Sequence, residues 1–208
     1  MTKLLLDIEN EQLKDSVKNL FSRIDYPLRF NKVKISTSYR TDFLWGDAKE
    51  DNMEIIINPE NRILEHKFLF YGYFARFIFM LINEKERVNQ EIKDKLEVPK
   101  LVEFVQNFFA DLKAVKYGFK QDMHRFFLEK ISKKIYKTES VSKEEYLEFY
   151  TYYLIFKKIG EEGEIKSLLE LVKVQGLDNL LREVEKLNYP FFLGDENLKK
   201  AWVEVFDI

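Results

Sequence analysis

The sequence predicts an α+β protein, in which a small early β-sheet packs on a central buried helix and a mostly helical C-terminal part follows. Three observations lead to this prediction. Two short segments before residue 60 have strand-like patterning, a long apolar segment occupies residues 63–82, and later apolar residues recur at helical spacing. Strands gathered early in a chain and helices gathered late are typical of the α+β class.

The first predicted helix spans residues 9–25, where apolar side chains recur along one helical stripe. Its apolar positions are Leu13, Val17, Leu20, Phe21 and Ile24. We expect the helix to end before Pro27, because a residue that precedes proline is disfavoured in the α region. A strand is predicted at 33–39, since Val33, Ile35 and Thr37 alternate there with polar residues.

Residues 40–52 are predicted to form a polar connection, and Met53–Asn58 to form the second strand. Three consecutive isoleucines in that strand predict that it is covered on both faces. The segment 63–82 has 15 apolar or aromatic residues out of 20, but Arg76 lies inside it. Its most apolar part, 68–82, is shorter than the roughly 20 residues that a membrane span requires. We therefore expect a buried helix and no membrane span.

The rest of the chain is predicted to be helical, with Pro99 beginning one helix and Gly118 at its C-terminal cap. The expected helices cover 88–96, 99–117, 119–136 and 142–160, with shorter ones beyond. We expect a single domain over 1–208, in which an α+β core at 1–118 carries a helical extension packed on it at 119–208.

The composition excludes several classes of function. Lysine and arginine (34) nearly balance aspartate and glutamate (36), so the net charge of −2 gives no reason to expect nucleic-acid binding. The chain has no cysteine, which excludes disulfides, thiolate nucleophiles and cysteine-containing metal sites. Many charged residues without cysteine are typical of a thermophilic protein in a reducing cytosol. Charged residues come too early in the N-terminal segment for a signal peptide, so we expect a cytoplasmic protein.

The order of a strand, a polar loop, an Ile-rich strand ending in Asn58-Pro59 and a long apolar helix resembles the catalytic core of zincin metallopeptidases, in their gluzincin-like branch. The resemblance covers about residues 33–110. In that family the helix carries the metal-binding motif H-E-x-x-H. The matching segment here reads Tyr71-Gly72-Tyr73-Phe74-Ala75, so Tyr71 and Ala75 stand at the histidine positions and Gly72 stands at the glutamate position.

Some members of the family place a third ligand in a segment close to E-A-N-x-F-A. The segment Val105-Gln106-Asn107-Phe108-Phe109-Ala110 is similar to it and has Val105 at the glutamate position. A phenol, a methyl group and an isopropyl group cannot replace two imidazoles and a carboxylate around zinc. Gly72 also lacks the carboxylate that would activate a water molecule. The resemblance therefore implies a zincin-like scaffold with no metal ligands, no catalytic residues and no cofactor.

The favoured hypothesis is a non-catalytic protein that binds another macromolecule, with another protein as the expected partner. The alternative is an enzyme whose site uses carboxylates and tyrosines. The candidate residues for that site are Asp42, Trp45, Asp47, Glu144 and Glu148. Glu144 and Glu148 share one helical face at i,i+4, a spacing that suits acid–base work or a divalent cation. Acidic residues also favour helix N-termini for purely structural reasons.

Overall fold

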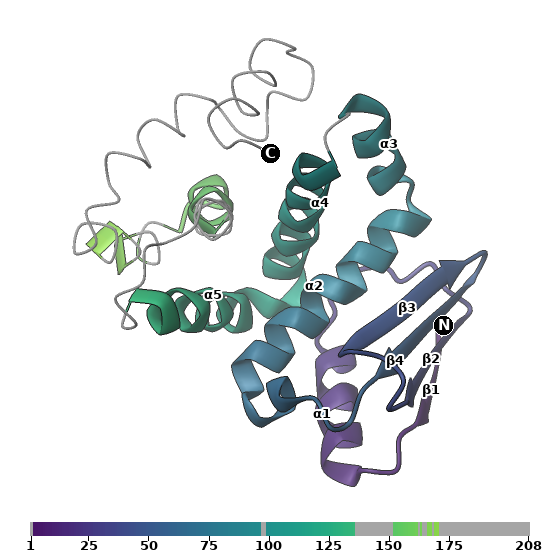
Figure 1. The fold of residues 1–208 in the computed structure, drawn as a ribbon. Helices are drawn as coiled ribbons and strands as arrows, with labels where there is room; N and C mark the ends of the chain where they lie inside the picture. The colour runs from purple at the N-terminus through teal and green to yellow at the C-terminus, as the bar shows by residue number, and fades with distance from the viewer. Residues whose placement is uncertain are drawn as a thin grey trace. The chain divides into compact units, whose positions relative to one another are not determined.

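The N-terminal part of the chain forms a four-stranded sheet with one helix after its first strand, and the other helices follow the last strand (Figure 1). A computed structural model describes residues 2–96, 99–135, 152–161, 163, 166, 167, 169 and 170. The elements are β1 (Lys3–Asp7), α1 (Glu11–Ser22), β2 (Lys32–Thr37), β3 (Leu44–Lys49), β4 (Asn52–Ile57), the 3-10 helix η1 (Arg62–Glu65), α2 (Lys67–Lys85), α3 (Val88–Lys95), α4 (Pro99–Ala114), the π-helical segment η2 (Val115–Phe119) and α5 (Lys120–Ile135). This combination confirms the predicted α+β class.

The sheet has the strand order β1-β2-β4-β3. β1 pairs in parallel with β2 and β2 pairs in parallel with β4, whereas β3 pairs antiparallel with β4. Helix α1 makes the crossover between β1 and β2 that a parallel pair requires. β3 and β4 form a tight hairpin, in which Glu50 has a φ of 49° and Lys49 lies opposite Asn52. The two edges of the sheet are therefore β1 and β3.

Two strands differ from the sequence prediction. β1 lies in a segment for which no strand is predicted, and β3 lies inside residues 40–52, so the prediction of a polar connection there is wrong. Leu44, Gly46 and Ala48 of β3 lie opposite buried residues of β4, but two of the three are small and show little alternation in the sequence. Pairing with β4 decides the conformation of this segment, because strand preference depends strongly on neighbouring strands.

One face of the sheet is buried and the other is open. The fully or almost fully buried positions on β2 and β4 are Val33, Ile35, Met53, Ile55 and Ile57. On the opposite face, Lys34 and Glu54 form a 3.1 Å ion pair in which both side chains are 42% exposed. Ile56 is only half-buried there, across from Trp45 of β3. The prediction that the Ile-rich strand is covered on both faces is therefore wrong.

Helix α2 is the central buried helix that the sequence predicts, since twelve of its 19 residues are buried. It packs on β3, where Gly46 leaves the necessary room: a Cβ at Gly46 would lie 2.8 Å from the ring of Phe77 and 3.0 Å from Leu81. Phe21 of α1 meets Phe74 of α2 edge-to-face, with the ring centroids 6.1 Å apart. No helix within the described ranges combines the length and the apolar character that a membrane crossing would need.

The later helices begin close to where the sequence places them. α4 starts at Pro99, as predicted, and α5 covers most of 119–136. Between α4 and α5, Gly118 has a φ of 115°, a conformation that other residues rarely adopt. Of the helix predicted at 142–160, residues 152–158 are helical, and the earlier part lies outside the described residues.

The chain divides into two compact units that alternate along the sequence. The first unit consists of residues 1–89 and 110–126, and the second consists of residues 90–109 and 127–208. The sheet, α1 and α2 belong to the first unit, whereas α4 and α5 each contribute residues to both. The expected single domain, with a boundary near residue 118, stays a prediction.

Candidate functional site

The positions that match the zincin motif lie in the buried middle of α2. Gly72, at the position that matches the glutamate, lies directly against Phe126 of α5. A Cβ at Gly72 would lie 2.5 Å from the Cβ and 2.6 Å from the Cδ2 of Phe126, whereas an ordinary van der Waals contact is 3.4–4 Å. Phe126 is fully buried, and its ring centroid lies 4.9 Å from that of Tyr73. An aromatic ring therefore fills the space that a side chain at position 72 would need.

The other matched positions carry no metal-binding chemistry. Tyr71 is 7% exposed, and the ammonium group of Lys67 lies 5.5 Å from the centroid of its ring. Ala75 is fully buried in α2. Val105 is fully buried in α4, in the part of that helix that belongs to the second unit. None of these side chains supplies the imidazole or carboxylate donors that zinc requires.

Directly after Ala75, Arg76 forms a buried ion pair with Asp111 of α4. Arg76 Nε donates to Asp111 Oδ1 and Nη2 donates to Oδ2, both at 2.8 Å. The Arg76 side chain is 10% exposed and that of Asp111 is fully buried. The guanidinium carbon also lies 5.2 Å from the centroid of the Phe126 ring. The pair therefore connects α2 to α4 beside the matched positions through two charge-assisted hydrogen bonds between buried groups.

From the sequence, Arg76 is cited only as evidence against a membrane span, and Asp111 is not identified as a candidate residue. A signal for the pair does exist in the sequence. Arginine is almost never buried without a partner, so an arginine inside an apolar helix requires a carboxylate from elsewhere in the chain. That requirement predicts an acidic partner but does not say which one.

Of the residues of the alternative carboxylate site, Asp42, Trp45 and Asp47 line neither the cavity near the start of α1 nor the one beside Tyr71. Asp42 is exposed, and its backbone oxygen accepts a 2.7 Å hydrogen bond from the side chain of Asn61. Trp45 is 46% exposed on the open face of the sheet. Asp47 forms a 2.6 Å ion pair with Lys49, whose pKa is raised by that hydrogen bond. Glu144 and Glu148 lie outside the described residues.

A tyrosine–carboxylate cluster that the sequence does not predict joins Tyr26, Glu86 and Lys113. The Tyr26 hydroxyl donates to Glu86 Oε1 at 2.5 Å, and Lys113 Nζ donates to Glu86 Oε2 at 2.5 Å. Burial and the hydrogen bond to Glu86 raise the pKa of Tyr26 to about 12. Burial alone would raise the pKa of Glu86, but hydrogen bonds from Lys113 and Tyr26 outweigh it and lower that pKa below its ordinary value. Tyr26 therefore stays protonated at neutral pH, and Glu86 connects it to Lys113 of α4.

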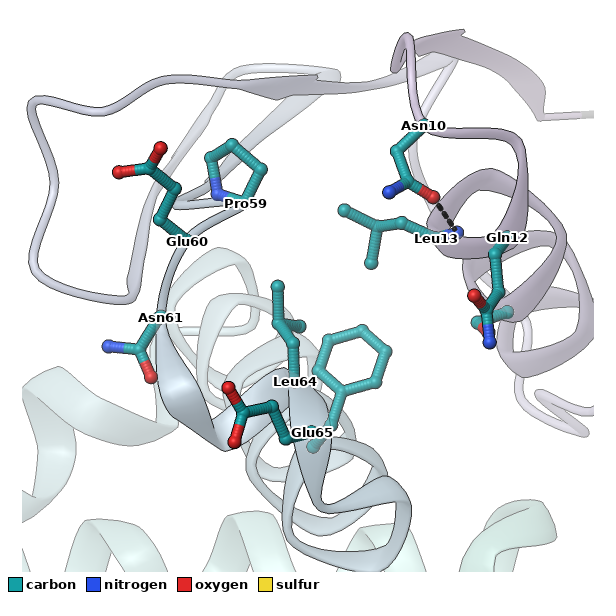
Figure 2. Close-up of a pocket in the computed structure, with 10 residues that line it drawn as sticks. Asn10, Gln12, Leu13, Pro59, Glu60, Asn61, Leu64 and Glu65 are labelled. Atoms are coloured by element: carbon teal, nitrogen blue, oxygen red, sulfur yellow. Dashed lines mark hydrogen bonds between the residues drawn. The ribbon is translucent and has the colours of Figure 1, made fainter.

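A cavity of about 510 Å³ lies between the start of α1 and the connection from β4 to α2 (Figure 2). The apolar side chains of Leu13, Leu64 and Phe70 line it together with the carboxylates of Glu60 and Glu65. Two asparagines also line it, but both serve as helix caps. Asn10 Oδ1 accepts from the backbone N–H of Leu13 and Asn61 Oδ1 from that of Ile63, each at 2.9 Å. Ser16 also lines the cavity, but its hydroxyl makes no hydrogen bond to Glu60 or Glu65. Among the described residues the cavity therefore pairs no nucleophile with a base.

The part of the chain that the structure describes contains no group of three or more histidine, cysteine, aspartate or glutamate residues that could hold a metal ion. No protein-family model matches the chain, and neither a curated protein nor a solved structure is significantly similar to it. The resemblance to zincins therefore stays a prediction, which depends on the order of elements and on the residues quoted above.

Proposed function

We propose that this chain is a non-catalytic binding protein, built on a zincin-like scaffold from which the metal site has been lost, and that its partner is another protein. The observation that carries the proposal is the contact between Gly72 and Phe126. In a working site the residue at this position would extend a carboxylate toward a metal-bound water. Here the ring of Phe126 takes that space, so the position serves packing rather than chemistry.

The arrangement of the first unit supports the scaffold part of the proposal. An antiparallel edge strand, β3, precedes the Ile-rich strand β4, and β4 leads through Pro59 and η1 into the long buried helix α2. The resemblance is drawn from a strand at 33–39 and a polar loop at 40–52 ahead of these elements. Because β3 occupies that loop, the support comes only from the Ile-rich strand, Pro59 and the long buried helix. The ion pair between Arg76 and Asp111 supports the loss of chemistry, because it uses the polar groups beside Ala75 to hold α2 to α4.

Metal analysis of the purified protein tests the proposal. Cells would be grown in zinc-supplemented medium, and the zinc content of the protein would be measured by mass spectrometry beside a known zinc peptidase purified in the same way. We expect far less than one zinc per chain and the same melting temperature with and without a chelator. One zinc per chain, with a lower melting temperature after chelation, would refute the proposal.

The kinship with zincins has its own test. The resemblance requires Tyr71, Ala75 and Val105 to converge on one place beside β4. An experimental structure in which Val105 lies far from the other two would remove the kinship, while the absence of metal chemistry could still hold. The carboxylate enzyme remains the alternative, although no contact in the described residues favours it. A cytoplasmic location and a thermophilic source likewise remain hypotheses from the composition.

A further inference from the structure

A second cavity in the first unit, of about 620 Å³, is lined by cations and by neutral hydrogen-bonding groups. Its walls come from α1, from the first turns of α2 and from the start of α5. Three cationic side chains line it: Arg23, Lys67 and Arg125. We propose that this cavity binds an acidic peptide segment of the partner protein. The inference rests on the proposed binding function and names the chemistry of the partner.

The charge balance of the cavity favours an anionic ligand. Asp15 and Asp122 also line it, but each already has a cationic neighbour. Asp122 is paired with Arg23, and Asp15 lies 3.4 Å from Lys18, which does not line the cavity. Lys67 and Arg125 have no carboxylate partner within the described ranges of the chain. Two positive charges are therefore left for a ligand to neutralise.

Both of these cations are held in place by aromatic rings. The guanidinium carbon of Arg125 lies 4.6 Å from the centroid of the Phe68 ring, and Lys67 Nζ lies 5.5 Å from that of Tyr71. When a guanidinium group lies over a ring, its N–H groups point outward in the guanidinium plane and stay free of the ring. They can then bind a carboxylate through two hydrogen bonds. The stacking thus orders the cations without using their hydrogen bonds.

Tyr71 supplies a further donor to the cavity. The residue is 7% exposed and lines the cavity, and its hydroxyl makes no hydrogen bond with any described residue. The hydroxyl oxygen itself is not enclosed, so it can donate to a ligand or water oxygen in the cavity. Lys67 and Phe68 also belong to the first turn of the 19-residue helix α2, whose positive dipole end favours anions.

The opposite wall explains why we infer a peptide rather than a free anion. Gln12, Ser16 and Asn19 lie on one face of α1, and their side chains make no hydrogen bond with any described residue. Amide and hydroxyl groups of this kind can both donate to and accept from a peptide backbone. A peptide that carries carboxylates matches both walls, since its backbone faces α1 and its acidic side chains face Lys67 and Arg125.

The test uses the full chain and three probes: an acetylated and amidated tetraglutamate peptide, the matching tetraglutamine peptide, and inorganic phosphate. Binding is followed by amide chemical shifts in NMR at low salt, where charge interactions are weakly screened. We expect saturable shifts centred on Lys67, Tyr71 and Arg125 with tetraglutamate, and at least about tenfold weaker binding of tetraglutamine. Binding of tetraglutamate should weaken as salt is added.

Variants separate this cavity from general surface charge. Arg125→Gln should weaken tetraglutamate binding about tenfold, because a charge-assisted bidentate contact is lost. Tyr71→Phe keeps the ring and should weaken binding a few-fold. Lys116→Gln is the matched control, since Lys116 is exposed and does not line the cavity, and it should bind like the unmodified chain. Unchanged thermal melts show that each variant is folded.

Three results would overturn the inference: no saturable shifts with tetraglutamate, equal weakening by Arg125→Gln and Lys116→Gln, or binding of phosphate without binding of the peptide. The outcome is independent of the metal analysis. If the protein binds tetraglutamate but also contains zinc, the proposed non-catalytic function is refuted and the cavity assignment stands. If the protein contains no zinc and does not bind tetraglutamate, only the cavity assignment is refuted.

Discussion

Replacing Gly72 with alanine tests whether Phe126 fills the space beside the middle of α2. The new Cβ would lie 2.5 Å from the Cβ of Phe126, so an ordinary contact of 3.4 Å requires α2 and α5 to separate locally by at least about 0.9 Å. The Cγ of Phe126 lies closer still. The obstruction includes the Cβ of Phe126, next to the backbone of α5, so a simple rotation of the ring cannot relieve it.

Two opposing effects set the size of the change. Alanine is more favourable than glycine within a helix by about 1 kcal/mol. Overpacking a buried site costs up to about 3 kcal/mol or somewhat more. We therefore expect Gly72→Ala to lower the free energy of unfolding by about 2 kcal/mol, which corresponds to a melting temperature roughly 4–8 °C lower for a chain of this size.

Urea unfolding followed by circular dichroism measures this free energy, and Gly163→Ala is the matched control. A Cβ at Gly163 would meet nothing within 4 Å, so that variant should be neutral or slightly stabilising. In a Phe126→Ala background the cost of Gly72→Ala should become smaller but should not vanish, because the Cβ at position 126 remains. A Gly72→Ala protein as stable as the original chain, or more stable, would refute the packing on which the proposed function depends.

Three further predictions follow from the contacts of the first unit. Arg76→Met should destabilise the protein by about 3–5 kcal/mol in urea unfolding, because it removes both hydrogen bonds that the guanidinium group donates to the buried Asp111 carboxylate. A loss below about 1 kcal/mol would contradict the buried pair. The pKa of Glu86 is lowered on folding, so Glu86 stabilises the protein above its unfolded pKa of about 4.5, and this stability is lost as the pH falls through the folded pKa. The pKa of Tyr26 is raised, so Tyr26 stabilises the protein below pH 10, and this stability is lost between pH 10 and about 12. Stability measured against pH should accordingly be flatter at the acid end in Glu86→Gln and at the alkaline end in Tyr26→Phe, and curves that match the original chain would contradict the cluster. Asn83 is fully buried with neither side-chain amide atom hydrogen-bonded, so Asn83→Leu should raise the free energy of unfolding by about 1–2 kcal/mol, and a comparable loss would instead indicate that an internal water bonds the amide.

The helices were predictable from the sequence because their signals are local. The apolar run at 63–82 identifies α2, and Pro99 is the first residue of α4, as the sequence predicts. The edge strand β3 was not predictable, because Gly46 and Ala48 are small enough to lie under α2 yet carry no clear alternation. Its conformation is imposed by pairing with β4 and by contact with α2, neither of which appears in a local pattern.

The candidate site shows the same division. Tyr71, Gly72 and Ala75 could be judged unfit for metal binding from their chemistry alone. The residues that fill and tie that region, Phe126 and Asp111, come from distant parts of the chain, and Asp111 lies 35 residues from Arg76. Periodicity shows that such residues are buried on a helix but not which helix they meet. The cavity beside Tyr71 depends likewise on three separate elements, so no single segment of sequence predicts it.

The alternation of the two units along the chain limits how the protein can be dissected. A fragment that stops after residue 89 would keep the whole sheet and α2, but it would lose the return segment 110–126. Arg76 would then lose its ion pair with Asp111, and the apolar surface beside Gly72 would be exposed to solvent. We therefore expect such a fragment to aggregate rather than behave as a small stable protein. A minimal version of the first unit would have to splice residues 110–126 onto residue 89 through an engineered linker.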